Sequence, residues 1–223
     1  MKKIALIGFG VVALGELVGL VMDNYDVQLV CKPLIMITLG IYYAASVDRE
    51  HRSTALLAAI VFSLAGDVLM LLAKDAENYF VLGLGSFLIA HIFYILTYRQ
   101  HRGENSPNEL QGVQRIRLAF PVILAGTGLV VVLYPLLGGL RVPVVLYAIV
   151  LVTMVLQALF RFGRTEALSF WLVFAGALLF MLSDSLIAIH KFMMPVGHAE
   201  LWIMSTYMAG QFLIVRGLLE HRG

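Results

Sequence analysis

Eight apolar runs, each about as long as a membrane-spanning helix, follow one another along this 223-residue sequence. They cover residues 3–22, 28–46, 54–73, 78–98, 117–137, 142–161, 167–190 and 199–218. An α-helix needs about 20 apolar residues to cross a bilayer, whereas the strands of a membrane barrel read as shorter alternating segments. The runs therefore predict an all-α polytopic membrane protein, a bundle of eight transmembrane helices.

The composition agrees with lipid as the solvent. Hydrophobic residues make up 61% of the chain and charged residues only 13%, against about 25% charged residues in a soluble domain. The connections are short except for the polar stretch 99–116, which divides the runs four and four. We expect one integral membrane domain over residues 3–218. The formal charge of +2 is too small to indicate a nucleic-acid partner.

The basic residues predict the orientation, because cytoplasmic loops carry an excess of Lys and Arg. Twelve of the sixteen lie at the termini and in the even-numbered connections: Lys2, Lys3, Arg49, Arg52, Arg99, Arg102, Arg115, Arg117, Arg161, Arg164, Arg216 and Arg222. The odd-numbered connections hold only Lys74, Arg141 and Lys191. Both termini are therefore expected to be cytoplasmic, in a bacterial cytoplasmic membrane.

Four charged residues lie inside the apolar runs and away from their ends: Glu16, Lys32, Asp67 and Asp184. A charge at the centre of a bilayer costs at least about 2.5–3.5 kcal/mol, so such residues usually serve a function. At about 1.5 Å per residue, all four are expected roughly 6–9 Å below the outer boundary. Tyr147 is expected at a similar depth.

Three ionised carboxylates and one ammonium group would leave a net charge of −2 in an apolar layer, so we expect at least one carboxyl group to be protonated. A neutral acid beside an ionised carboxylate is suited to acid–base hydrolysis. The serines flanking Asp184 favour its ionised form, which leaves Asp67 as the acid. A small residue, Gly66 or Ser183, precedes each aspartate and would let a substrate approach. In the structural alternative, Lys32 pairs with a carboxylate and fixes the packing.

Other polar residues of the runs complete a candidate substrate pocket. The expected substrate-binding residues are Lys32, Glu16, Tyr147, Tyr207, Gln211, His91 and Ser63. No metal site is expected, because His and Cys do not cluster at zinc-ligand spacing, and no cofactor motif is present. Tyr94 and Tyr98 are expected in the aromatic belt at the inner boundary. Gly15 and Gly19 form a GxxxG pattern typical of close helix packing.

Several of these segments together resemble the YhhN-like lysoplasmalogenase family. They are "CKPLIM", "FSLAGDVLML", "FLIAHIFYI", "GALLFMLSDSLIAIHKF" and "STYMAGQFLI". The resemblance covers nearly the whole chain and implies an eight-helix membrane fold. One small departure is Ala90 before His91, where the family often has glycine.

The resemblance also implies an activity and its residues. Characterised eukaryotic members of the family hydrolyse the vinyl ether bond of lysoplasmalogens to a fatty aldehyde and glycerophosphocholine or glycerophosphoethanolamine. The functional aspartates of the family match Asp67 and Asp184, and its lysine matches Lys32. The implied partners are a lysophospholipid substrate and membrane lipid. Lys32 would hold the substrate phosphate.

A second class of function fits the same intramembrane charges. A proton-coupled transporter or lipid-binding membrane protein also places carboxylates within the bilayer. Transporters often contain helices interrupted by Gly or Pro near the midplane. Here Pro33 and Pro143 are expected near helix starts and Pro135 near a helix end, which favours an enzyme.

Overall fold

The computed structural model of the protein describes residues 1–73, 77–103 and 109–221. Its long helices are α1 (Lys2–Val21), α2 (Tyr25–Ala44), α3 (Thr54–Leu72), α4 (Glu77–Gln100), α5 (Gly112–Leu133), α6 (Arg141–Leu159), α7 (Ala167–Phe192) and α8 (Ala199–Leu219). Short 3₁₀ turns lie at η1 (Arg49–His51), η2 (Tyr134–Leu136) and η3 (Gly138–Leu140). Each predicted run is thus a helix, and the described residues contain no strand.

Seven of the eight helices among the described residues are long and apolar enough to cross a membrane. The exception is α8, which carries Glu200, Gln211 and Arg216 among its apolar residues. Gln211 is fully buried, so part of this polarity faces protein. The all-α polytopic class is confirmed, while the spanning role of α8 stays a prediction.

The exposed face of α1 shows why a lipid solvent is needed. Ile4, Ile7, Val11, Leu14 and Val18 are each between 53% and 75% exposed. They recur every three or four residues and so form one apolar stripe. A soluble monomer rarely exposes a continuous apolar surface of this kind, so the stripe is suited to acyl chains.

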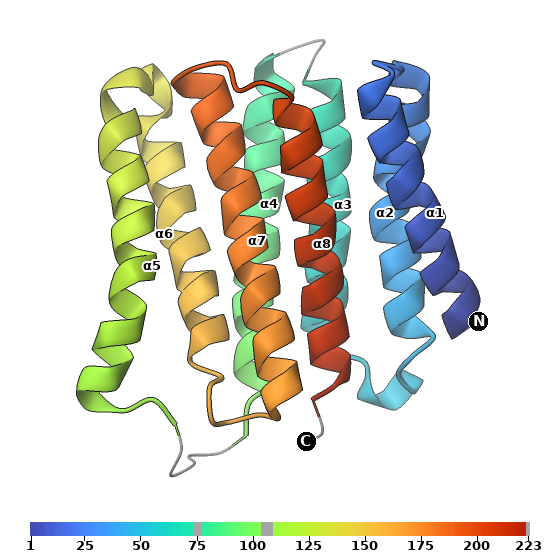
Figure 1. Ribbon diagram of the computed structural model, residues 1–223, viewed down its shortest axis with the longest axis vertical. Coiled ribbons are helices and arrows are strands. Elements are labelled where there is room, and N and C mark those ends of the chain that lie inside the picture. The colour runs from blue at the N-terminus through green and yellow to red at the C-terminus, as the bar shows by residue number, and fades with distance from the viewer. Residues whose placement is uncertain (74–76, 104–108, 222–223) are drawn as a thin grey trace. The chain divides into compact units, whose positions relative to one another are not determined.

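The chain forms two compact units, residues 1–97 and 98–223. The first contains α1, α2, α3 and all but the last residues of α4, and the second contains α5 to α8. Within each unit the helices run side by side, as Figure 1 shows. The division falls just before the polar connection, in line with the predicted four-and-four arrangement. That residues 3–218 form a single domain stays a prediction.

In the first unit, glycines bring the first two helices together. A Cβ at Gly15 would come within 2.8 Å of the Cys31 Sγ, and a Cβ at Gly19 within 3.0 Å of Val27. The predicted GxxxG packing is therefore confirmed for α1 against α2. Pro33 lies inside α2 rather than near its start, yet α2 is continuous from Tyr25 to Ala44.

The packing of α3 against α4 combines polar and aromatic contacts. The Ser86 hydroxyl on α4 donates a hydrogen bond to the carbonyl oxygen of Phe62 on α3, with an O···O distance of 2.7 Å. The Phe62 and Phe93 rings stack with centroids 5.6 Å apart. These contacts hold α4 against α3, the helix that carries Asp67.

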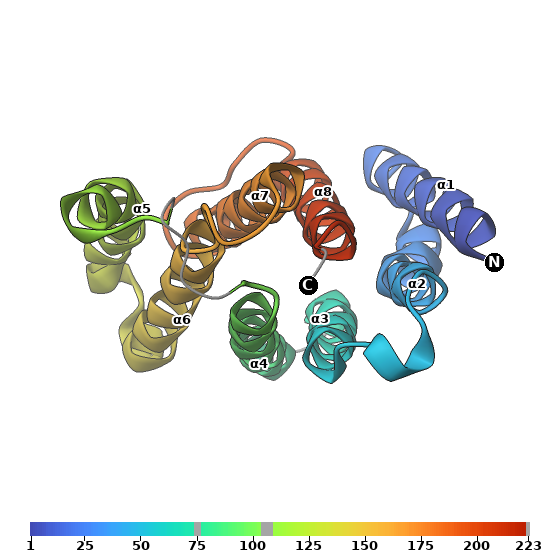
Figure 2. The ribbon, with the colours of Figure 1, turned by 90° about the horizontal axis from the view of Figure 1, so that it is seen from below.

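In the second unit, α7 lies between α6 and α8 (Figure 2) and packs most closely on α8. A Cβ at Gly176 would come within 2.7 Å of the Gly210 carbonyl oxygen, and one at Gly217 within 2.8 Å of the Leu172 Cβ. The backbones of α7 and α8 therefore touch, which only glycine permits at these positions.

A fully buried arginine, Arg161, ties the ends of three segments together in the second unit. Its guanidinium group donates to the His101 carbonyl oxygen at 3.0 Å and to the Ser169 hydroxyl at 2.9 Å. The Ser169 hydroxyl in turn donates to the Gly217 carbonyl oxygen at 2.7 Å. Burial lowers the pKa of Arg161 to about 10, so the group remains charged at neutral pH.

The tyrosines near the end of α4 correct one prediction. Tyr94 and Tyr98 are completely buried, so they do not form an aromatic belt facing lipid. Their spacing on one face of α4 reflects packing against protein. Exposed aromatic residues lie elsewhere near helix ends, at Trp171 on α7 and Trp202 on α8, where interfacial aromatics are expected.

Candidate active site

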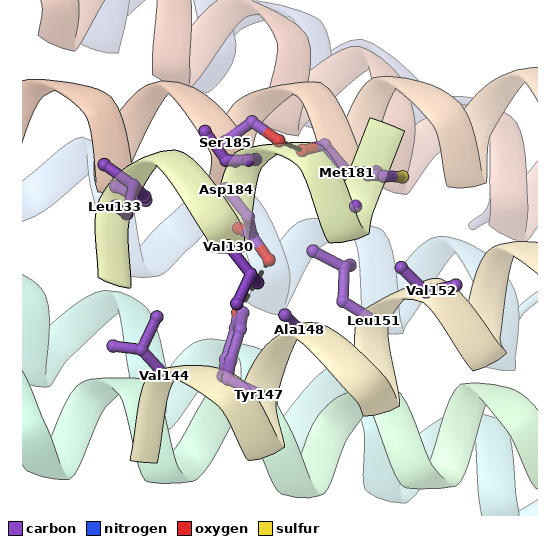
Figure 3. A pocket seen from close by; sticks show the side chains of 13 residues that line it. Val130, Leu133, Val144, Tyr147, Ala148, Leu151, Val152, Met181, Asp184 and Ser185 are labelled. Atoms are coloured by element: carbon purple, nitrogen blue, oxygen red, sulfur yellow. Dashed lines mark hydrogen bonds between the residues drawn. The ribbon is translucent and has the colours of Figure 1, made fainter. Parts of the chain in front are cut away.

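The central contact of the second unit joins Tyr147 on α6 to Asp184 on α7. The tyrosine hydroxyl donates a hydrogen bond to Asp184 Oδ2 with an O···O distance of 2.6 Å. Figure 3 shows the two side chains pointing toward each other from facing helices. A distance this short is typical of a hydroxyl bound to a carboxylate. The sequence placed both residues at a similar depth, and the structure brings them into contact.

A small cavity adjoins this pair. Its volume is about 50 Å³, and its walls come from α5, α6 and α7. Most of the lining is aliphatic, including Val130, Leu133, Val144 and Leu151 (Figure 3). A cavity of this size has room for at least one water molecule, and the Asp184–Tyr147 pair provides polar partners for it. The site therefore combines a carboxyl group with space for a small reactant.

The α5 wall of this cavity was missed by sequence reasoning, which assigned no site residue to the run 117–137. Gly126 on α5 lines the cavity. A Cβ at this position would clash with Val152 Cγ2 on α6, so glycine permits the close approach of the two helices. The sequence signal that could have indicated this wall is a glycine, Gly126, within a run of mostly branched apolar residues.

The serines beside Asp184 do not supply the polarity expected of them. The Ser183 hydroxyl donates to the Ile203 carbonyl oxygen at 3.0 Å, and the Ser185 hydroxyl to the Met181 carbonyl oxygen at 2.7 Å. Their protons are thus directed to backbone groups. The polar contact to Asp184 instead comes from Tyr147 on another helix, which can stabilise the carboxylate when it is ionised.

Asp67 lies in the first unit, on α3, and is only 2% exposed. Ser63, one turn earlier on the same helix, is fully buried. The expectation that Gly66 makes room for a substrate is wrong, because a Cβ there would come within 2.7 Å of the Phe87 ring of α4. Gly66 therefore serves helix packing. That Asp67 and Asp184 share one cavity stays a prediction, since they belong to different units.

Two more predicted site residues of the first unit lie on α1 and α2. Glu16 is fully buried on α1, and Lys32 is half-buried on α2. Within the described residues Lys32 forms no ion pair or hydrogen bond. The structural alternative, in which Lys32 is paired with a buried carboxylate, therefore gains no support from these residues.

The remaining predicted residues are buried. His91 on α4 is fully buried in the first unit. Tyr207 and Gln211 lie one turn apart on α8 in the second unit and are 3% and 0% exposed. The Tyr207 ring meets Phe180 of α7 edge to face, with centroids 5.4 Å apart. Phe180 lies one turn before Asp184, so Tyr207 helps to fix the segment of α7 that carries the carboxyl group.

No three potential metal ligands gather among the described residues. His190, near the end of α7, instead accepts a hydrogen bond at Nδ1 from the Val196 backbone amide at 3.0 Å. This contact holds the connection from α7 to α8. The described site presents the Asp184 carboxyl group and the Tyr147 hydroxyl group beside a mostly aliphatic cavity.

Comparison with known proteins gives a consistent picture. The model of the YhhN family matches residues 27–218. Human "Lysoplasmalogenase TMEM86A" is 32% identical over 176 residues, covering 76% of this chain and 67% of the relative. Human "Lysoplasmalogenase TMEM86B" is 31% identical over 162 residues, covering 73% and 62%. "Lysoplasmalogenase" of Mycobacterium tuberculosis is 29% identical over 198 residues, covering 86% and 71%. No solved structure is found to match.

Proposed function

The chain belongs to the YhhN family, and from this membership we propose that it is an ether hydrolase that cleaves the vinyl ether bond of lysoplasmalogens. The observation that carries the proposal is the similarity over about three quarters of the chain to two human proteins named lysoplasmalogenase. The matched segment spans about two thirds of the length of those relatives. The products would be a fatty aldehyde and glycerophosphocholine or glycerophosphoethanolamine.

The reaction needs a proton donor, a carboxylate and a water molecule. Protonation of the β-carbon of the vinyl ether leaves an oxocarbenium ion. Water then adds to the cationic carbon and loses a proton. The resulting hemiacetal breaks its bond to the glycerol oxygen, which gains a proton while the hemiacetal hydroxyl loses one to form the aldehyde. Glycoside hydrolases divide a similar task between two carboxyl groups, one acting as acid and one facing the cation.

The residues of the second unit suit the second of these roles. Asp184 lies beside a cavity that has room for water, and Tyr147 holds one of its oxygens. A carboxylate kept in place by a neutral donor can face a positive charge and accept the proton of the attacking water. We assign this role to Asp184 and the role of proton donor to Asp67, which is buried on α3.

A proton-coupled transporter is the alternative function for the same charges. Its hallmark would be a helix interrupted near the membrane midplane. Among the described residues, α2 continues through Pro33 and α5 through Pro121 without interruption. This continuity favours the enzyme.

The proposal is tested with purified protein in detergent, where no ion gradient exists. The protein is incubated in D₂O with a lysoplasmalogen, and the aldehyde is trapped and analysed by mass spectrometry. If the β-carbon is protonated, the aldehyde should carry one deuterium on its α-carbon, the carbon bonded to the carbonyl carbon. A 1-alkyl lysolipid is the matched control, because it lacks the double bond and should yield no aldehyde. Absence of aldehyde from the vinyl ether in well-folded protein would contradict the proposal.

A further inference from the structure

A polar pocket, distinct from the cavity beside Asp184, lies in the second unit, where residues at the end of α6 and before α7 meet described residues between α4 and α5. Its volume is about 110 Å³. The residues lining it, here called the arginine pocket, are Arg102, Glu109, Leu110, Arg115, Phe160 and Arg164. By the same measure a single water needs only about 10–15 Å³, so the arginine pocket has room for a group of several heavy atoms.

Three guanidinium groups in the arginine pocket face a single carboxylate. Arg164 forms an ion pair with Glu109. The Arg115 guanidinium lies over the Phe160 ring, with its carbon 3.9 Å from the ring centroid. Burial and the neighbouring charges of Arg164, Arg99 and Arg115 lower the pKa of Arg102. Among the described residues, the arginine pocket therefore holds three positively charged side chains and one negatively charged side chain.

Backbone contacts hold the two connections together at this place. The Gly103 amide donates to the Arg164 carbonyl oxygen at 2.8 Å, and the Arg164 amide to the Arg161 carbonyl oxygen at 3.0 Å. The buried Arg161 side chain binds the His101 carbonyl oxygen next to Arg102. Arg102 and Arg164 thus project from backbone segments that these contacts hold side by side, which keeps the bases of the two side chains close together.

We propose that the arginine pocket binds a phosphate group. The planar guanidinium fork matches the geometry of phosphate oxygens, and an anion would relieve the repulsion between the three arginines. The arginine pocket lies where α5 begins and α6 ends, at the end of two apolar helices, which is the level of lipid headgroups. Basic pockets at this level commonly hold anionic lipid headgroups, and a soluble phosphate ester has the same recognition chemistry.

This phosphate site is separate from the proposed active site. Arg164 precedes the start of α7 at Ala167, whereas Asp184 lies seventeen residues further along that helix. At 1.5 Å per residue this is about 25 Å. The phosphate group in the arginine pocket is therefore not that of a lysolipid being cleaved beside Asp184.

The experiment measures binding to purified protein in a non-ionic detergent. One arm adds dioleoyl phosphatidylglycerol, with dioleoyl phosphatidylcholine for comparison, and counts bound lipid by native mass spectrometry. The other arm adds inorganic phosphate or glycerol 3-phosphate and measures the shift in the thermal unfolding midpoint. The variants are Arg102→Gln and Arg115→Gln. Arg117→Gln is the matched control, because Arg117 is exposed on the same helix as Arg115 but does not line the arginine pocket.

We expect phosphatidylglycerol or a soluble phosphate to bind to the unaltered protein. Arg102→Gln and Arg115→Gln should each weaken this binding at least about tenfold, because each removes a charge-assisted hydrogen bond. Arg117→Gln should change it less than twofold. Binding of the lipid alone identifies a headgroup as the source, and binding of the soluble anions identifies a free phosphate. If Arg102→Gln does not fold, the binding measured for Arg115→Gln tests the proposal, because Arg115 is exposed. No binding in either arm, or equal weakening by Arg117→Gln, overturns the proposal.

Discussion

At the scale of single residues, the contact between Tyr147 and Asp184 carries the most chemical information. Both side chains are buried, and their oxygens lie 2.6 Å apart. Sequence reasoning placed them in one layer by counting residues along two helices. The direction in which each side chain points depends on helix rotation, which depth does not determine, so their hydrogen bond could not be predicted.

The first prediction removes this hydrogen bond. Tyr147→Phe keeps the ring but removes the hydroxyl that donates to Asp184, and a hydrogen bond to a charged group is worth about 1.5–3 kcal/mol. We expect kcat for aldehyde release to fall about tenfold or more, with a smaller change in KM. Tyr134→Phe is the control, because the Tyr134 side chain is 48% exposed and does not line the cavity. Equal effects of the two variants would rule out a specific role for Tyr147.

The second prediction concerns Lys32, for which the described residues show no ion pair. If its ammonium group holds the substrate phosphate, Lys32→Ala should raise KM about tenfold, because the variant loses the binding free energy of one charge-assisted hydrogen bond. The change in kcat should be smaller, because a contact remote from the reacting bond contributes mostly uniform binding. Steady-state kinetics of folded protein provide the measurement, and an unchanged KM would exclude the phosphate role.

Small residues next to the aspartates show a limit of sequence reasoning at this scale. Gly66 was interpreted as room for a substrate, but Phe87 fills that space. Ser183 and Ser185 were interpreted as a polar environment, but their hydroxyls bind backbone carbonyl groups. A small or polar residue in a membrane helix serves packing as readily as chemistry, and the sequence alone does not distinguish the two.

At the scale of helices, all eight predicted runs are observed, with ends that differ by a few residues. The largest difference is in α5, which was expected at 117–137 and extends from Gly112 to Leu133. Its start was missed because the polar Gln114 and Arg115 precede the apolar run, although a helix can continue beyond the membrane surface. Its end comes early because Pro135 lies within a 3₁₀ turn that follows.

The third prediction tests the contact between α7 and α8. Gly176→Ala places a Cβ 2.7 Å from the Gly210 carbonyl oxygen and 2.8 Å from the Ile214 amide, both backbone atoms. Overpacking of this kind costs about 1–3 kcal/mol, so we expect a lower thermal unfolding midpoint in detergent.

The control for this substitution is Gly128→Ala on α5, where a Cβ meets nothing within 4 Å. Alanine stabilises a helix relative to glycine by about 0.5–1 kcal/mol, so the control should be neutral or more stable. An unchanged midpoint for Gly176→Ala would show that the two helices can separate slightly at no cost.

At the scale of the whole molecule, the division into two units of four helices was indicated by the polar connection 99–116. The distribution of Lys and Arg predicts that both termini lie in the cytoplasm. The fourth prediction is that single cysteines at Arg141 and Lys191, in a Cys31→Ala background, react with a membrane-impermeant maleimide in intact cells. The third expected external position, Lys74, lies outside the described residues.

Cysteines at Arg49 and Glu220 are the matched internal positions for this labelling. Both should react only after the membrane is permeabilised. Glu220 follows the end of α8, so its protection also tests whether α8 spans the membrane. Labelling of Arg49 in intact cells would reverse the orientation, and labelling of Glu220 alone would show that α8 does not cross.

The fifth prediction addresses the central proposal, that Asp67 and Asp184 act together in the hydrolysis. Asparagine is nearly isosteric with aspartate and cannot donate a carboxyl proton or carry its charge. We expect Asp67→Asn and Asp184→Asn each to lower kcat by about 10²-fold or more, the low end for lost acid–base catalysis. Asp23→Asn is the control, because Asp23 is exposed and has a φ of 51°, a conformation that asparagine adopts readily.

The decisive measurement is the rate of aldehyde release by the double variant Asp67→Asn/Asp184→Asn, compared with the two single variants and Asp23→Asn. When two groups act as a unit, removing either one abolishes their joint contribution to the rate. The account therefore predicts that the double variant is little slower than either single variant. A double variant slower by the product of the two single effects would mean that the aspartates act independently. A single variant that folds and releases aldehyde at a nearly normal rate would contradict the carboxyl pair.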